Sequence, residues 1–218
     1  MKFTCADCGT KACEQMNYDK MPDASVCISK NIDQQWFKDK YNEEDIEIAH
    51  NAAVTEAAGY CRQTRLEETM AFAYRMGYHK LGIAFCTGLS KEAATLAGVL
   101  RDNGFEVEAA CCKCGAIPKS FVGVAQEEQL HPERDFEIMC NPAGQAAFLD
   151  AAGVDLALVL GLCVGHDTIF LRQIKAPVTY VAVKDRATGH NPLAAIYCAN
   201  GYLRRVFSFV KTHWPSKP

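Results

Sequence analysis

Long apolar runs, an excess of either charge and a targeting segment are all missing from this 218-residue chain. The longest strongly apolar run, 156–164, is far shorter than the roughly 20 residues a membrane helix needs. A formal net charge of −3 and a pI near 6.1 give no electrostatic basis for binding nucleic acid or an anionic membrane. The N-terminus lacks a basic stretch followed by an apolar one, so no signal peptide is expected. We therefore expect a cytoplasmic protein with neither a nucleic-acid nor a membrane partner.

Several sequence signatures of nucleotide binding and hydrolysis are also missing. The first predicted strand runs into Phe85-Cys86-Thr87-Gly88-Leu89-Ser90, which is not the Gly-x-Gly-x-x-Gly turn of dinucleotide-binding proteins. The chain contains no Walker loop, no Gly-x-Ser-x-Gly elbow and no His-Glu-x-x-His. Dinucleotide binding therefore has little support.

Cysteine, in contrast, is abundant, with twelve residues. Without a secretion signal, a cysteine-rich chain is expected to bind metal or carry out redox chemistry rather than to form structural disulfides. Some cysteines are expected to act only as small buried apolar residues. We interpret Cys61 and Cys198 in this way.

The chain pattern predicts an α/β fold. Three segments run from helix to glycine to apolar strand, with strands predicted at 81–86, 105–111 and 156–162, and a fourth strand at 178–183. Such short, nearly continuous apolar strands are typical of a parallel sheet covered by helices on both faces. The helices are expected at 43–58, 65–76, 91–103 (capped by Ser90), 142–152, 166–174 and 202–210. We predict a cysteine-rich module at 1–40, followed by a Rossmann-like domain of about four strands at 41–218.

Four cysteines are expected at the carboxyl ends of these strands: Cys86, Cys112, Cys140 and Cys163. Binding sites in parallel sheets form outside these ends, and neighbouring strands lie about 4.8 Å apart, so the four thiols are placed to share a metal or cluster. Cys140 precedes a helix N-terminus, which favours thiolate. Cys111 and Cys114 are alternatives to Cys112. Simple burial at strand ends, or a disulfide relay, would also explain the group.

A second group comprises Cys5, Cys8, Cys13 and Cys27. The Cys-x-x-Cys-x-x-x-x-Cys spacing lets three thiolates converge from one compact loop, and four thiolates suit zinc or an iron–sulfur cluster. The spacing matches neither a zinc ribbon nor the bacterial ferredoxin run. We predict a metal site here, with a reactive or surplus thiol cluster as the alternative.

Polar residues follow the third and fourth strands. Lys184 and Arg186 would hold a carboxylate or phosphate, although a solvated turn would look the same. His166, three residues after Cys163, is spaced for joint ligation, and either His166 or His190 would move protons. Asp167 is equally well explained as a helix-terminal acid.

The chain resembles a prokaryotic family of unknown function whose members are described as predicted metal-binding proteins. The resemblance covers nearly the whole chain and rests on Cys5-x-x-Cys8, Phe85-Cys86-x-Gly88-Leu89, Cys112-Lys113-x-Gly115, Met139-Cys140-Asn141-Pro142, Gly161 to Asp167, and Val183-Lys184-Asp185-Arg186 through His190-Asn191-Pro192. It implies metal binding but no particular reaction.

These patterns predict a metal-binding protein with one or two iron–sulfur clusters, of the 4Fe-4S type, and with zinc as the alternative in the N-terminal module. Redox or cluster-assisted chemistry on a small anionic molecule, with a redox partner protein, is one expected function. A non-catalytic zinc or iron accessory or sensor protein is the other, and a thiol-redox protein is a weaker third. The sequence does not decide whether the protein is an enzyme.

Overall fold

The computed structural model describes residues 5–214. The chain divides into two compact units, Met1–Tyr60 and Cys61–Pro218, which are described separately. The first unit ends at Tyr60 and not at residue 40, because it includes the helix that follows the cysteine-rich segment.

The first unit consists of short helical turns followed by one long helix. The elements are η1 (Cys5–Asp7), η2 (Tyr18–Lys20), α1 (Ile28–Asn31), α2 (Gln34–Lys38) and α3 (Glu43–Gly59). Asn42 starts α3 with a capping box: its side chain accepts from Asp45 N at 2.8 Å, and the Asp45 carboxylate accepts from Asn42 N at 3.2 Å. The helix predicted at 43–58 is confirmed.

The second unit alternates strands and helices. In chain order it contains α4 (Arg65–Arg75), β1 (Lys80–Phe85), η3 (Thr87–Leu89), α5 (Ser90–Asp102), β2 (Glu106–Cys111), η4 (Lys119–Val122), η5 (Gln126–Glu128), α6 (Pro142–Ala151), β3 (Leu156–Leu160), α7 (His166–Gln173), β4 (Val178–Ala182), α8 (Leu193–Tyr197), η6 (Arg204–Ser208) and α9 (Phe209–His213).

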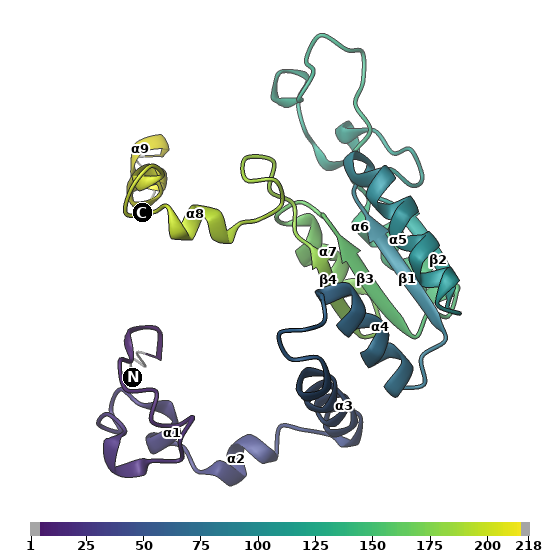
Figure 1. Ribbon diagram of the computed structural model, residues 1–218. Helices are drawn as coiled ribbons and strands as arrows, with labels where there is room; N and C mark the ends of the chain where they lie inside the picture. The colour runs from purple at the N-terminus through teal and green to yellow at the C-terminus, as the bar shows by residue number, and fades with distance from the viewer. Residues whose placement is uncertain (1–4, 215–218) are drawn as a thin grey trace. The chain divides into compact units, whose positions relative to one another are not determined.

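The four strands form one parallel sheet in the order β2-β1-β3-β4 (Figure 1). Phe85, the last residue of β1, pairs with Cys111 of β2 on one side and with Leu160 of β3 on the other. The chain leaves β1 toward β2 and later returns to the opposite side of β1, so the strand order reverses between β1 and β3. A crevice forms at the carboxyl ends of the strands at such a reversal.

Helices cover both faces of the sheet. On one face Leu81, Ile83 and Leu158 pack with α4 and α5, and on the other Ala84 and Val159 pack with α6 and α7. Successive side chains of a strand point to opposite faces, so both sets are buried and the strands read as continuous apolar runs. The predicted Rossmann-like α/β class is confirmed.

Two details differ from the sequence prediction. Ser90 is not the cap of α5: η3 runs directly into the helix, Leu89 holds the cap position, and Ser90 Oγ donates to Thr87 O at 2.6 Å. The single helix predicted at 202–210 is instead divided into η6 and α9. Among residues 5–214, no helix is long and apolar enough to span a lipid bilayer.

Candidate metal centre

Three thiols converge where β1 and β2 end and α6 begins. Cys112 Sγ lies 3.9 Å from Cys140 Sγ, and Cys86 lies near enough to Cys112 for the two thiols to shift each other's pKa. Cys86 and Cys112 are only 6% and 2% exposed, and Cys140 is half-buried. The structure therefore brings together three of the four cysteines predicted at the strand ends.

Backbone hydrogen bonds that extend the sheet fix these three positions. Cys86 N donates to Leu160 O at 3.1 Å, and Cys112 N donates to Phe85 O at 2.8 Å. Asn141, the residue after Cys140, donates from its backbone to Cys112 O at 2.7 Å. The thiols are held near one another by the main chain and not by side-chain packing alone.

Proton sharing among the thiols separates their pKa values. Hydrogen bonds with Cys140 and then Cys86, together with burial, raise the pKa of Cys112. The hydrogen bond with Cys112 is the main cause that lowers the pKa of both Cys86 and Cys140. Cys112 Sγ also accepts a hydrogen bond from Thr87 N at 3.3 Å. The lowered pKa values of Cys86 and Cys140 favour thiolate, the form of cysteine that binds metal.

Positive charge surrounds the three sulfurs. Lys184 lowers the pKa of Cys86 by charge and hydrogen bonding, and Lys113 and His166 lower that of Cys140 by charge. A Cβ atom added at Gly88 would lie 3.3 Å from Lys184 Nζ and 3.9 Å from Cys86 Sγ, so the missing side chain leaves room for this approach. Cations at this position stabilise thiolate.

The fourth predicted ligand, Cys163, is paired differently. Arg186 Nη2 donates to Cys163 Sγ at 3.4 Å, and this contact raises the pKa of Arg186. Cys111 and Cys114, the two alternatives to Cys112, do not join this group of thiols. Cys111 Sγ accepts from Lys113 N at 3.5 Å, and Cys114 Sγ faces Asn141 O at 3.8 Å. Cys112 is therefore the loop cysteine in contact with Cys86 and Cys140.

Gln145 of α6 supports the group, although no sequence pattern distinguished it. Its side chain is fully buried, and Nε2 donates to Phe85 O at 3.2 Å and Ala110 O at 2.6 Å, joining the ends of β1 and β2. The sequence signal that could have identified Gln145 is an amide side chain at a position of α6 that is otherwise surrounded by apolar residues. Asn141 caps α6, with Oδ1 accepting from Gly144 N at 2.8 Å.

The two predicted histidines differ in their surroundings. His166 is the first residue of α7, and its Nδ1 is buried with no hydrogen-bond partner among the described residues. His190 Nδ1 accepts from Asp185 N at 3.1 Å, and His190 N donates to Asp185 O at 2.8 Å. His190 is thus part of the turn that follows β4.

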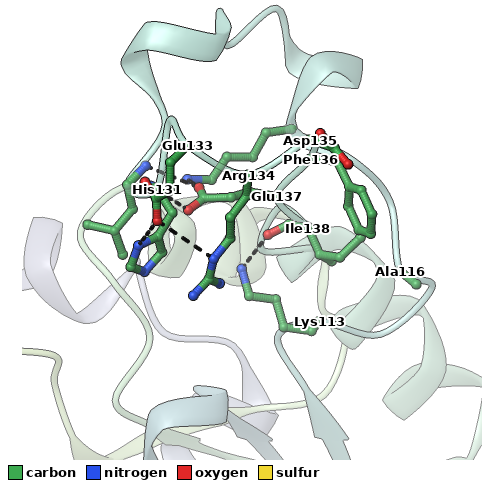
Figure 2. Close-up of a pocket in the computed structure, with 11 residues that line it drawn as sticks. Lys113, Ala116, His131, Glu133, Arg134, Asp135, Phe136, Glu137 and Ile138 are labelled. Atoms are coloured by element: carbon green, nitrogen blue, oxygen red, sulfur yellow. Dashed lines mark hydrogen bonds and ion pairs between the residues drawn. The ribbon is translucent and has the colours of Figure 1, made fainter.

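A cavity of about 800 Å³ lies within the long loop between β2 and α6, which extends away from the sheet in Figure 1. Figure 2 shows the side chains around it, with Lys113, His131 and Arg134 on one side and Phe136 on the other. Lys113 joins the cavity to the thiol group, because its Nζ donates to Ile138 O at 2.5 Å while its charge acts on Cys140. The loop contains η4, η5 and a bridge between Pro118 and Ile138.

The N-terminal cysteines lie in the first unit, Cys5 and Cys13 exposed, Cys8 and Cys27 partly buried. A hydrogen bond with Thr10, 3.5 Å from Cys8 Sγ, is the first cause that lowers the pKa of Cys8. The interpretation of Cys61 and Cys198 as buried residues was wrong, because both are exposed. They lie at a helix-to-helix turn and at the end of α8, where no core covers them.

The donor chemistry of the thiol group fits a metal, although the ligand shell is not assembled. Within the described part of the chain, no three His, Cys, Asp or Glu side chains are arranged as ligands of one ion. The 3.9 Å between Cys112 and Cys140 nevertheless approaches the about 3.8 Å expected for two thiolates on one tetrahedral zinc.

Comparisons with known proteins give a family and a distant structural similarity. A family model described as a protein of unknown function (DUF1847) matches residues 25–181. The uncharacterized protein MJ0455 of Methanocaldococcus jannaschii is 41% identical over 194 residues, which cover 89% of this chain and 97% of that protein. Two crystal structures of Dph2 from Pyrococcus horikoshii, one with a 4Fe-4S cluster, match at TM-scores of 0.36 and 0.35 with 17% and 19% identity. Both matches cover 66% of this chain, which spans about a third of each Dph2 chain, 32% and 33%. At these scores the similarity carries no information about cofactor or reaction.

Proposed function

The chain belongs to the DUF1847 family of unknown function, and we propose from its own residues that it is a metal-binding protein with an iron–sulfur centre at the strand ends. The sequence motifs also indicated a family of unknown function. Because that family has no known reaction, the reaction of this protein must be argued from the residues of the site.

The observation that carries the proposal is the convergence of Cys86, Cys112 and Cys140 in a buried, positively charged setting. Soft thiolate ligands select zinc, copper(I) and iron–sulfur clusters over hard cations. All twelve cysteines are free, as expected in a reducing cytoplasm, where we place the protein.

A bound iron–sulfur cluster would supply electron transfer or a Lewis-acidic iron at this position. The surrounding residues then have separate tasks. Lys184 and Arg186 would bind the oxyanion of a small molecule, and His190 or His166 would carry protons. A redox partner protein would exchange electrons with the centre, and the loop cavity beside Lys113 offers space for the small molecule.

We further propose that Cys5, Cys8, Cys13 and Cys27 bind a second metal, either a cluster or zinc. Cys5 and Cys8 are joined by a backbone hydrogen bond of 3.3 Å from Cys8 N to Cys5 O, which keeps the Cys-x-x-Cys pair in one turn. Soft thiolates in one short segment suit either metal.

The second candidate function is a non-catalytic zinc or iron accessory or sensor protein. The 3.9 Å separation of Cys112 and Cys140 favours it, because two thiolates on a single ion approach each other this closely. Cysteines of a cluster bind different irons and lie farther apart.

Metal and sulfide analysis of anaerobically purified protein, with its visible spectrum, tests the proposal. We expect iron, acid-labile sulfide and a brown colour, with one centre lost in C112S and none lost in the exposed-thiol control C198S. Colourless protein with zinc and no iron would favour the accessory function. Metal content unchanged by C112S would contradict a centre at the strand ends.

A further inference from the structure

The fourth ligand position of the strand-end centre was assigned to Cys163 from the sequence, but the structure pairs that thiol with Arg186. Arg186 donates to Cys163 Sγ at 3.4 Å, and this hydrogen bond raises the pKa of Arg186. Cys163 therefore already has a hydrogen-bond partner away from the group formed by Cys86, Cys112 and Cys140.

His166 lies at the carboxyl end of the sheet, after β3, and has an unused nitrogen. It opens α7, and its backbone donates to Cys163 O at 3.0 Å, which fixes the start of the helix at the strand ends. Its Nδ1 is buried and has no hydrogen-bond partner in the part of the chain described. Buried polar atoms are nearly always paired, so this nitrogen indicates a partner that protein atoms do not supply.

The packing of two helices places His166 and Cys140 at the same edge of the sheet. Residues of α6 and α7 share one buried cluster, and α6 begins two residues after Cys140 while α7 begins at His166. Neutral imidazole nitrogen is a common metal ligand, and three cysteines with one histidine form a known set for zinc.

We infer that the strand-end centre is bound by Cys86, Cys112, Cys140 and His166 through Nδ1, and that Cys163 positions Arg186 instead of binding metal. This inference rests on the proposed metal centre and specifies its ligands. With His166 bound to the metal, His190 is the residue left to carry protons at the site. Arg186, positioned by Cys163, is the group that binds the oxyanion.

The test uses the full-length chain with Cys5, Cys8, Cys13 and Cys27 replaced by serine, so that only the strand-end centre contributes. Into this background H166A, H166C and C163S are introduced singly, with the exposed histidine variant H79A as control. Iron, zinc and sulfide per chain, the visible and electron paramagnetic resonance spectra, and circular dichroism melting are measured anaerobically.

We expect H166A to lose at least half of the metal or to shift the spectrum, and millimolar imidazole to restore it. H166C should retain metal with an altered spectrum, because sulfur replaces nitrogen, while C163S and H79A should match the background. Wild-type metal content and spectrum in H166A would overturn the His166 assignment, and metal loss in C163S would return Cys163 to the ligand set. A background protein that holds no metal would overturn the strand-end centre itself. Melting curves and imidazole rescue separate ligand loss from misfolding.

Discussion

Gln145 shows how much of this site depends on a single uncharged side chain. From within the core, its Nε2 bridges the carbonyls of Phe85 and Ala110 at the ends of β1 and β2. In Q145L both carbonyls lose this donor, so we expect the free energy of unfolding to fall by about 1–3 kcal/mol. Urea denaturation measures the change, with the exposed Q173L as control. Equal midpoints for Q145L and Q173L would mean that the bridge adds no stability.

Glu137 organises the loop around the cavity. It pairs with Lys119, and its carboxylate accepts from Leu130 N at 3.2 Å and His131 N at 2.8 Å. We expect E137Q to speed hydrogen–deuterium exchange at these two amides at neutral pH. The hydrogen bond from Lys119 lowers the pKa of Glu137 in the folded protein.

Because this pKa is depressed on folding, the carboxylate stabilises the loop above the ordinary glutamate pKa, and this contribution is lost as pH falls through the folded value. The difference in exchange between wild type and E137Q should therefore shrink on acidification. A difference that stays constant while the Glu137 carboxyl titrates, as followed by its NMR chemical shift, would contradict the role of the ionised carboxylate.

Some residues of the site could be predicted and others could not. Cys86 and Cys140 follow from strand and helix boundaries, which apolar runs and the Asn-Pro opening make visible. Cys112 could not be separated from Cys111 and Cys114, because regular side-chain alternation ends where β2 becomes a turn. The pairing of Cys163 with Arg186 depends on two strands meeting in space, which one sequence does not encode locally.

At the scale of elements, the start of α6 carries both helix stability and ligand position. Asn141 Oδ1 caps the helix through Gly144 N, and Nδ2 donates to Cys114 O at 3.1 Å. N141A should destabilise the protein by about 1 kcal/mol and speed the loss of metal to a chelator. N141D keeps the capping oxygen, so it should retain most of the stability. Identical thermal midpoints for N141A and wild type would argue against the cap.

The strands were predicted to within about two residues of their observed ends because each is an apolar run bounded by glycine or a polar turn. Gly77 and Gly104 end their helices with φ of +69° and +90°, a conformation that glycine adopts without strain. Strand order was not predictable, because it depends on which strands pair in space, and the local sequence of each strand does not encode its partners. The division between η6 and α9 was also missed, because an aromatic-rich segment outside the core has no clear period.

At the scale of the whole molecule, the two cysteine groups belong to different units. Met1–Tyr60 contains one group and Cys61–Pro218 the other, so we expect their metals to be lost independently. The C5S/C8S/C13S/C27S variant should lose one centre, C112S the other, and the combined variant both. Metal analysis per chain measures this. Loss of all metal in the fourfold variant would show that the two groups are coupled.

The main-chain bond from Asn141 N to Cys112 O has an evolutionary consequence. It closes the base of the long loop, so the ligands on either side keep their places whatever the loop contains. Loop closure costs little more as a loop lengthens. Descendants of this sequence are therefore free to extend, trim or recompose the segment that surrounds the cavity, and so change the molecules that reach the sulfurs while inheriting the same arrangement of cysteines.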